Sequence, residues 1–163
     1  MTKIWNESGF VADDPWIIET EEVQAGSNEK AILGLDAFLA KTGETGLGVL
    51  INPADDVRRL EGHLDRLALV AVAFPAFSDG RAFSHASLLR SRLGFTGEVR
   101  AVGDVLIDQI PLMLRCGVDS FAVSNATALK RLAENRLPGI DNHYQPTARP
   151  SQDVGSYSWR RRA

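Results

Sequence analysis

The chain has 163 residues, of which 44% are hydrophobic and 24% charged, so it is long enough for one domain with a substantial core and short for two. Its net charge of −3 lacks the basic excess typical of nucleic-acid-binding proteins, and the terminal Arg160–Arg162 triplet is expected to be a solvated tail. With one cysteine, Cys116, no intrachain disulfide can form, which fits a reducing cytoplasm. No apolar stretch reaches membrane-spanning length, so we expect neither secretion nor membrane insertion.

The N-terminal part, residues 1–45, is predicted to be a mixed segment of short strands and one helix. Apolar residues at 4–5, 10–11 and 16–18 alternate with turn signals at Ser8-Gly9 and Asp13–Pro15, which is typical of short strands. Residues 31–41 place Leu35, Phe38 and Leu39 at helical spacing, and Gly43 follows as a stop signal. We therefore predict a helix over 31–41.

Residues 46–137 are predicted to form four consecutive strand–helix units. Strands are expected at residues 47–51, 69–74, 99–102 and 120–123. The first of these is a short continuous apolar run, which is typical of a strand buried on both faces. The helices expected after them cover 57–67, 81–93, the stretch to Arg115, and 125–135. Asn52 to Asp56 should start the first of these helices, and Asn125 should cap the last.

This order predicts a single α/β domain over residues 1–137 with a parallel sheet and right-handed crossovers. An open three-layer sandwich is the simpler arrangement. Because the last two units look like late units of a barrel, a half-barrel that dimerises is the alternative. Residues 138–163 contain three prolines and little to bury, and are predicted to be an extended or disordered tail.

The expected functional loops follow the strands, because ligands of parallel α/β proteins bind beyond the carboxyl ends of the strands. In the loop after Phe74, Gly80 would allow close backbone approach, and Arg81 could hold a carboxylate, a sulfur oxyanion or a phosphate with two hydrogen bonds. The structural alternative is that Asp79 caps the helix and Arg81 pairs with a neighbouring acid.

The loop after Val102 places Asp104, Asp108 and Arg115 within about 40° of one face, if the helix is regular. This face could bind a ligand, or it could be a structural or interfacial network of ion pairs. Pro111 lacks an N–H group and predicts either a kink or a helix start nearby.

Several specific signals are missing. The glycines at 43, 46 and 48 precede a strand, whereas a dinucleotide-binding loop follows one, and no P-loop lysine pattern is present. The histidines at 63, 85 and 143 have no partner at metal-ligand spacing, so no metal site is expected. Cys116, at a helix end, is interpreted as a structural thiol rather than a nucleophile.

The central segment nevertheless resembles a known family. The motifs are Phe74-Pro-x-Phe-Ser-Asp-Gly-Arg81, Leu89-Arg90, Gly97-Glu-Val-Arg-Ala-Val-Gly-Asp-Val105, Asp108-Gln109 and Arg115-Cys-Gly117. They are similar to a bacterial family of unknown function that carries the label of an oxidoreductase associated with sulfite reduction, with members encoded beside assimilatory sulfite-reductase genes. The central half of the chain matches strongly, residues 16–53 weakly, and the tail is not covered.

The resemblance implies a cytoplasmic role in sulfite or sulfate assimilation without identifying a reaction. The family usually has an apolar or aromatic residue where Pro111 stands, which concerns the local helix geometry. The candidate site residues that carry over are Asp79, Gly80, Arg81, Arg90, Arg100, Gly103, Asp104, Asp108, Gln109 and Arg115.

Three functions compete. The leading hypothesis is an accessory protein that binds a small anion, or a sulfite-reductase component, through Arg81, Arg100 and the face from Asp104 to Arg115. The second is a non-catalytic homodimer with Asp104, Asp108 and Arg115 at its interface. The third is an oxidoreductase with a borrowed flavin or nicotinamide cofactor.

Overall fold

The computed structural model describes residues 1–76 and 78–138, and it contains one eight-stranded sheet in the order β2-β1-β8-β7-β6-β5-β4-β3. The strands are β1 (Lys3–Asn6), β2 (Gly9–Phe10), β3 (Trp16–Ile18), β4 (Lys30–Gly34), β5 (Leu47–Ile51), β6 (Leu67–Phe74), β7 (Glu98–Gly103) and β8 (Ser120–Val123). The strands from β3 to β8 are parallel to their neighbours, and β1 pairs antiparallel with both β8 and β2.

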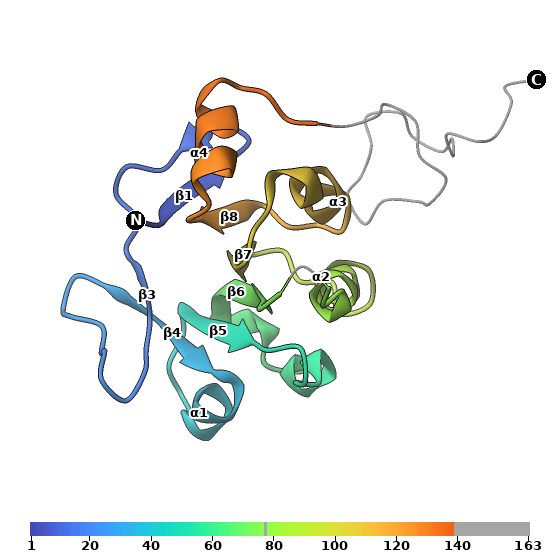
Figure 1. Cartoon of the computed structure of the whole chain (residues 1–163). Helices are drawn as coiled ribbons and strands as arrows, with labels where there is room; N and C mark the ends of the chain where they lie inside the picture. Colours follow the sequence, from blue (N-terminus) through green and yellow to red (C-terminus); the bar gives the residue numbers. More distant parts are fainter. Residues whose placement is uncertain (77, 139–163) are drawn as a thin grey trace, which may run out of the picture.

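The helices lie on the convex side of this sheet, which curls into a half-barrel (Figure 1). They are α1 (Leu35–Ala40), α2 (Arg81–Ser91), α3 (Ile110–Arg115) and α4 (Ala126–Ala133), with short 3₁₀ turns η1 (Val57–Leu60), η2 (Leu64–Arg66) and η3 (Ile107–Gln109). Because each parallel strand from β4 to β8 lies beside the next one in sequence, right-handed crossovers place the connections between these strands on the same face. The predicted parallel α/β sheet is thus confirmed in its half-barrel form. A three-layer sandwich would need helices on both faces.

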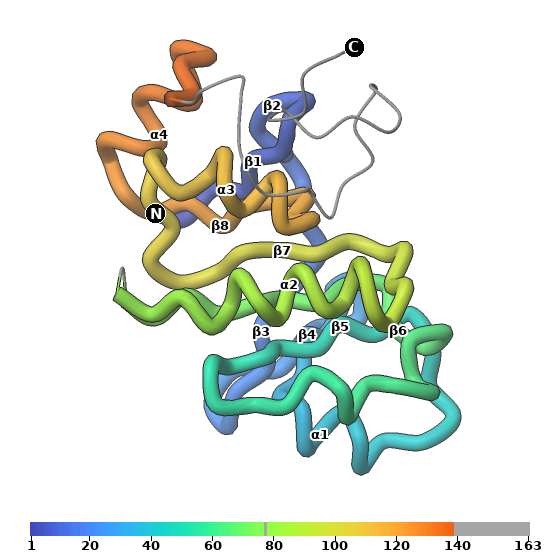
Figure 2. The backbone as a smooth tube through the Cα atoms, turned by 90° about the vertical axis from the view of Figure 1, so that its right-hand side faces the viewer, coloured from blue at the N-terminus to red at the C-terminus, as the bar shows by residue number. Residues whose placement is uncertain are grey.

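The main core lies between the sheet and the helices. Phe38, Phe74 and Phe121 are fully buried there, and Leu89 of α2 packs into the same cluster. A second, smaller apolar cluster lies on the concave face and includes Ile32, Leu69, Ala71 and Val102. Figure 2 shows α2 running along the convex side of the sheet, with α3 beside β7 and β8.

The helix expected over residues 31–41 is wrong in its first half. Lys30–Gly34 is strand β4, hydrogen-bonded between β3 and β5, and α1 begins only at Leu35. Ile32 and Leu33 are both buried, on opposite sides of the sheet, which is the pattern of a strand. The helical spacing of Leu35 and Phe38 is correct, and both side chains are buried.

The helix expected over residues 57–67 is also wrong, because that stretch forms only the turns η1 and η2. Gly62 separates them with a φ of +81°, a value that a continuing helix cannot accommodate. The cap of η1 is Asp56, whose carboxylate accepts a hydrogen bond from the Arg58 N–H, rather than Asn52. The connection between β5 and β6 is therefore shorter and thinner than a full helix.

Other predicted elements are confirmed. Helix α2 buries Ala82, Ala86 and Leu89 as its spacing predicts, and Asn125 caps α4 by accepting from the Ala128 N–H at 3.0 Å. Pro111 stands in the first turn of α3, which confirms a helix start there. The predicted tail over 138–163 lies, apart from Pro138, outside the described residues. In the described residues, no helix has the length and apolar character that a membrane span requires.

Candidate functional site

The loop between β6 and α2 holds an exposed Arg81–Asp79 pair. Arg81 Nε and Nη2 donate to the two Asp79 carboxylate oxygens at 3.0 and 2.8 Å, and the Arg81 backbone N–H donates to Asp79 at 3.2 Å. These hydrogen bonds lower the pKa of Asp79 and raise the pKa of Arg81. The Arg81 side chain is 62% exposed and that of Asp79 only 16%, so a fixed guanidinium faces solvent at the carboxyl end of β6.

His85 lies one turn further along α2 than Arg81, between the Arg81–Asp79 pair and the loop after β5. Its Nδ1 atom is buried and has no hydrogen-bond partner among the described residues. Burial lowers the pKa of His85, and the charges of Asp55 and Asp56 oppose that shift. We call Asp55, Asp56, Asp79, Arg81 and His85 the strand-end cluster.

Sequence reasoning found only Asp79 and Arg81 of this cluster. The signal for the others was available, since Asp55 and Asp56 follow β5 and the carboxyl ends of parallel neighbours meet at one edge. The Asp55 and Asp56 carboxylates also accept hydrogen bonds from backbone N–H groups, at 2.7 Å from Asn52 and 3.0 Å from Arg58. Both carboxylates thus also stabilise the local turns of the chain.

The half-buried imidazole of His85 predicts a pH-dependent stability. Because burial holds the folded-state pKa of His85 below the usual value of about 6.5, the unfolded chain binds a proton first as the pH falls. The stability is therefore complete above about pH 6.5 and is lost as the pH falls through the lower folded-state pKa. His85→Gln should flatten the dependence of the urea-unfolding free energy on pH between about 7.5 and 5.5.

Ser84→Ala is the matched control for this experiment, because it changes an exposed side chain in the same turn without removing an imidazole. Its unfolding free energy should follow that of the unmodified chain at every pH. An unchanged slope in His85→Gln would contradict a titrating, half-buried His85.

At the end of β7, Gly103 brings the backbone against β6. Its φ is +95°, and a Cβ there would lie 2.5 Å from the Phe74 carbonyl oxygen. The Asp104 N–H donates to that same oxygen at 2.7 Å. Gly103 therefore joins the two loops that the sequence singled out, and Asp104 lies exposed beyond them.

The predicted face of Asp104, Asp108 and Arg115 does not assemble. Asp104 precedes η3, and α3 begins only at Ile110, so the three residues do not share one helix. Asp108 is exposed and faces Arg131 of α4 at 4.0 Å, while Arg115 is half-buried at the end of α3. Gln109, the last residue of η3, is half-buried as well. The start of α3 at Ile110, with Pro111 in its first turn, places Arg115 on a different element from Asp104 and Asp108.

Arg90 lies at the opposite end of the sheet from the strand-end cluster. Its guanidinium donates to the carbonyl oxygens of Phe95, Gly97 and Gly117 at 2.7, 2.8 and 3.0 Å and also pairs with Asp119. These contacts fasten the C-terminal end of α2 to the beginnings of β7 and β8. The geometry supports a structural role for Arg90.

Arg100 points to the concave face of the sheet and is held by two carboxylates. Its Nη1 and Nη2 donate to Asp14 at 2.7 and 2.8 Å, and Nη2 also donates to Glu98 at 2.9 Å. Nε donates to the Ser120 hydroxyl at 3.2 Å. Burial alone would lower the pKa of Arg100, but the hydrogen bonds and charges of Asp14 and Glu98 outweigh it and raise that pKa.

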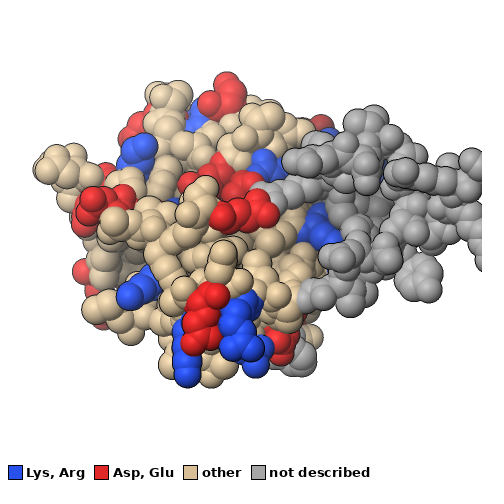
Figure 3. All heavy atoms as spheres, turned by 90° about the horizontal axis from the view of Figure 1, so that it is seen from above, with Lys and Arg blue, Asp and Glu red and all other residues tan. Residues whose placement is uncertain are grey.

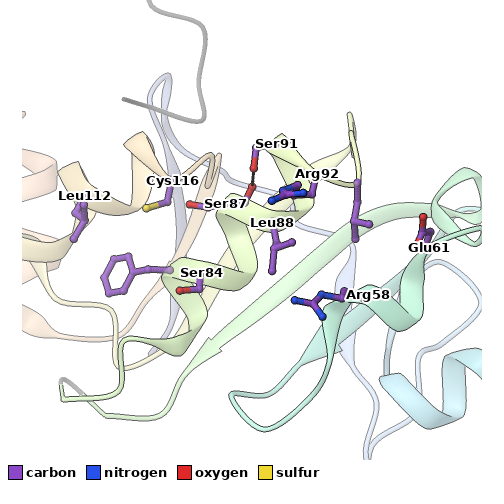
Figure 4. Close-up of a pocket in the computed structure, with 11 residues that line it drawn as sticks. Arg58, Glu61, Ser84, Ser87, Leu88, Ser91, Arg92, Leu112 and Cys116 are labelled. Atoms are coloured by element: carbon purple, nitrogen blue, oxygen red, sulfur yellow. Dashed lines mark hydrogen bonds between the residues drawn. The ribbon is translucent and has the colours of Figure 1, made fainter. Parts of the chain in front are cut away.

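A groove of about 830 Å³ runs along the outer side of α2, between η1 and α3 (Figure 4). It exists because the thin η1–η2 connection leaves this flank of α2 uncovered. Leu88, Leu112 and Cys116 line it together with the serines of α2. Burial raises the pKa of the Cys116 thiol, which fits the structural role expected for it.

Charged side chains of both signs are distributed over the visible surface. Figure 3 shows positive and negative side chains interspersed among other residues on the face seen from above. Within residues 1–76 and 78–138, no cluster of three or more His, Cys, Asp or Glu side chains could hold a metal ion.

The fold and these loops define an α/β half-barrel protein with a polar cluster at the carboxyl ends of its parallel strands. A family model described as "Bacterial protein of unknown function (DUF934)" matches residues 48–154, more than half of the chain, and the chain belongs to this family. The match covers β5 to α4 and leaves β1 to β4 outside it. No curated protein and no solved structure gave a match.

Proposed function

We propose that this protein is an accessory protein of assimilatory sulfite or sulfate reduction in the bacterial cytoplasm. It works by binding a small anion, or a component of the sulfite reductase, through the loops at the carboxyl ends of its strands. The pathway rests on the resemblance in the motifs from Phe74 to Arg81 and from Gly97 to Val105. The binding role rests on the geometry of Arg81.

The observation that carries the binding role is a guanidinium that is both exposed and fixed. Asp79 holds Arg81 through Nε and Nη2, and Nη1 has no hydrogen-bond partner among the described residues. Holding the side chain in place lowers the entropy that binding must remove. Arg81 also begins the eleven-residue helix α2, whose N-terminal dipole favours an anion. A sulfur oxyanion accepts hydrogen bonds from such a group.

The alternative of a homodimer built on Asp104, Asp108 and Arg115 has less support, because these residues lie on separate elements. An oxidoreductase would need a cofactor, and flavin or nicotinamide titration of the purified protein would detect one. The exposed Arg81 favours the accessory binder over both.

Growth on sulfate tests the proposal. In the host bacterium, Arg81→Ala should slow growth on sulfate as the sole sulfur source by about twofold or more and leave growth on cysteine unchanged. One charge-assisted hydrogen bond to an anion is worth about 1.5–3 kcal/mol, enough to empty the site at limiting anion.

Arg136→Ala is the matched control, because Arg136 is also exposed and also pairs with an acid two positions away, Glu134. It should leave growth on both sulfur sources unchanged. Equal growth of the Arg81→Ala strain and the parent on sulfate would refute the proposal. If Arg81→Ala does slow growth on sulfate, calorimetric titration of the purified protein with sulfite distinguishes an anion site from docking on the reductase. Only a protein with an anion site should bind sulfite in the absence of the reductase.

A further inference from the structure

The concave side of the half-barrel is crossed by the segment Val11–Pro15, which we call the strap. Strands β2 and β3 lie at opposite ends of the sheet, and the strap is the link between them. It must therefore pass over the open side of the sheet, as Figure 1 shows on the side away from the helices.

The strap is fixed at both ends and near its middle. The Val11 N–H donates to the Ile4 carbonyl at 2.8 Å, and the Pro15 carbonyl accepts from the Lys30 N–H at 2.7 Å. Between them, the Asp14 carboxylate holds Arg100 of the central strand β7 with two hydrogen bonds. The strap thus occupies the side on which a second half-barrel would pack to complete a barrel.

Under the strap remains a chamber of about 810 Å³. In closed eight-stranded barrels inward side chains fill the interior, but here the inward residue of β8 that lines the chamber, Ala122, is small. A smaller hollow of about 560 Å³ lies next to it and shares the Asp14–Arg100 pair as a wall. The larger chamber has the size of a small-molecule site rather than of a protein segment.

The walls of the chamber are mostly apolar, and besides Arg100 and Asp14 they include the exposed residues Thr2 and Lys3. Trp16 packs against Gly48, where a Cβ would approach the indole to 3.0 Å, and Lys30 Nζ lies 5.3 Å from the centre of the Trp16 ring. At the rim, Phe10, Val11 and Ile18 are 36–40% exposed, which is unusual for large apolar side chains gathered around one opening. The polar groups of the inner wall, Arg100 and Asp14, already satisfy each other.

We propose that this chamber binds a small, uncharged, predominantly apolar molecule that lies against Trp16. The site is separate from the strand-end cluster and does not depend on the function proposed for it. Its chemistry follows from its walls, because most of the lining is apolar and the buried charge among the lining residues, Arg100, is already paired with Asp14. An apolar ligand would also cover the exposed rim.

The uncharged dye N-phenyl-1-naphthylamine is the probe for this site. It should bind the full chain at one molecule per chain, with enhanced dye fluorescence and quenching of tryptophan emission. Ala122→Phe fills the chamber from β8 and should weaken dye binding about tenfold or more. Ile18→Glu, at the exposed rim, should weaken it as well and keeps the test valid if Ala122→Phe fails to fold.

Leu112→Ser is the matched control, because Leu112 is 37% exposed but lines the groove beside α2 on the convex side. It should leave dye binding unchanged. The proposal is overturned if the dye does not bind, if Ile18→Glu binds as tightly as the unmodified chain, or if Leu112→Ser alone abolishes binding. The proposal would also be overturned if light scattering detected a dimer and dye fluorescence fell as the dimer formed. A second copy of the chain would then fill the chamber.

Discussion

Arg100→Ala should cost about 3 kcal/mol of the free energy of unfolding, measured by urea denaturation at pH 7. The Arg100 side chain is 5% exposed, and Asp14 and Glu98 are 18% and 34% exposed. Removing the guanidinium leaves two partly buried carboxylates next to each other without their cation, and this desolvation cost is larger than the lost attraction. The partial exposure of Glu98 keeps the expected loss at the lower end of the range for buried pairs.

The matched control for Arg100→Ala is Arg59→Ala. Arg59 pairs with Asp36 at 3.0 Å, but the two side chains are 49% and 89% exposed, so its loss should cost less than about 0.5 kcal/mol. Asp14→Asn combined with Arg100→Ala should recover part of the stability, because one uncompensated charge is removed. A loss below about 1 kcal/mol in Arg100→Ala would show that water reaches the carboxylates and that the strap is loosely held.

The strands could be predicted from sequence where their burial is two-sided. β5 and β6 are continuous apolar runs and β7 and β8 are mainly apolar, because both faces of the sheet exclude water. The half-barrel form could not be chosen in the same way, because four units fit either arrangement. The choice became clear with β4 and β3, which continue the sheet in sequential order. The prediction missed β4 because the helix expected over residues 31–41 covers all of that strand except Lys30.

The candidate site shows a similar division. The structural alternative expected Asp79 to cap the helix and Arg81 to pair with a neighbouring acid. The N-cap of α2 is Gly80, and the acid that pairs with Arg81 is Asp79, two positions away. The pairing of Arg100 with Asp14 spans 86 positions, and no local pattern indicates it. The sequence around an arginine on a buried strand is the same whether the guanidinium is available to a ligand or is already paired with a carboxylate of the protein. Only the path of the strap distinguishes the two cases.

Gly103→Ala should cost about 3 kcal/mol, because two separate penalties fall on one methyl group. A φ of +95° is unfavourable for alanine by about 1–2 kcal/mol. In addition, the new Cβ would lie 2.5 Å from the Phe74 carbonyl oxygen, so the ends of β6 and β7 must move apart at a further cost of about 1–3 kcal/mol. Urea denaturation measures the sum.

Gly43→Ala separates the two penalties. Gly43 has a φ of +82°, and a Cβ there meets nothing within 4 Å, so only the backbone term applies and about 1 kcal/mol should be lost. Equal losses in the two variants would show that the ends of β6 and β7 move apart without a measurable cost in the free energy of unfolding.

A larger loss for Gly103→Ala has a functional consequence as well. The same movement breaks the Asp104–Phe74 hydrogen bond and shifts the start of the loop that carries Arg81, so growth on sulfate should fall with a variant that touches no charged residue.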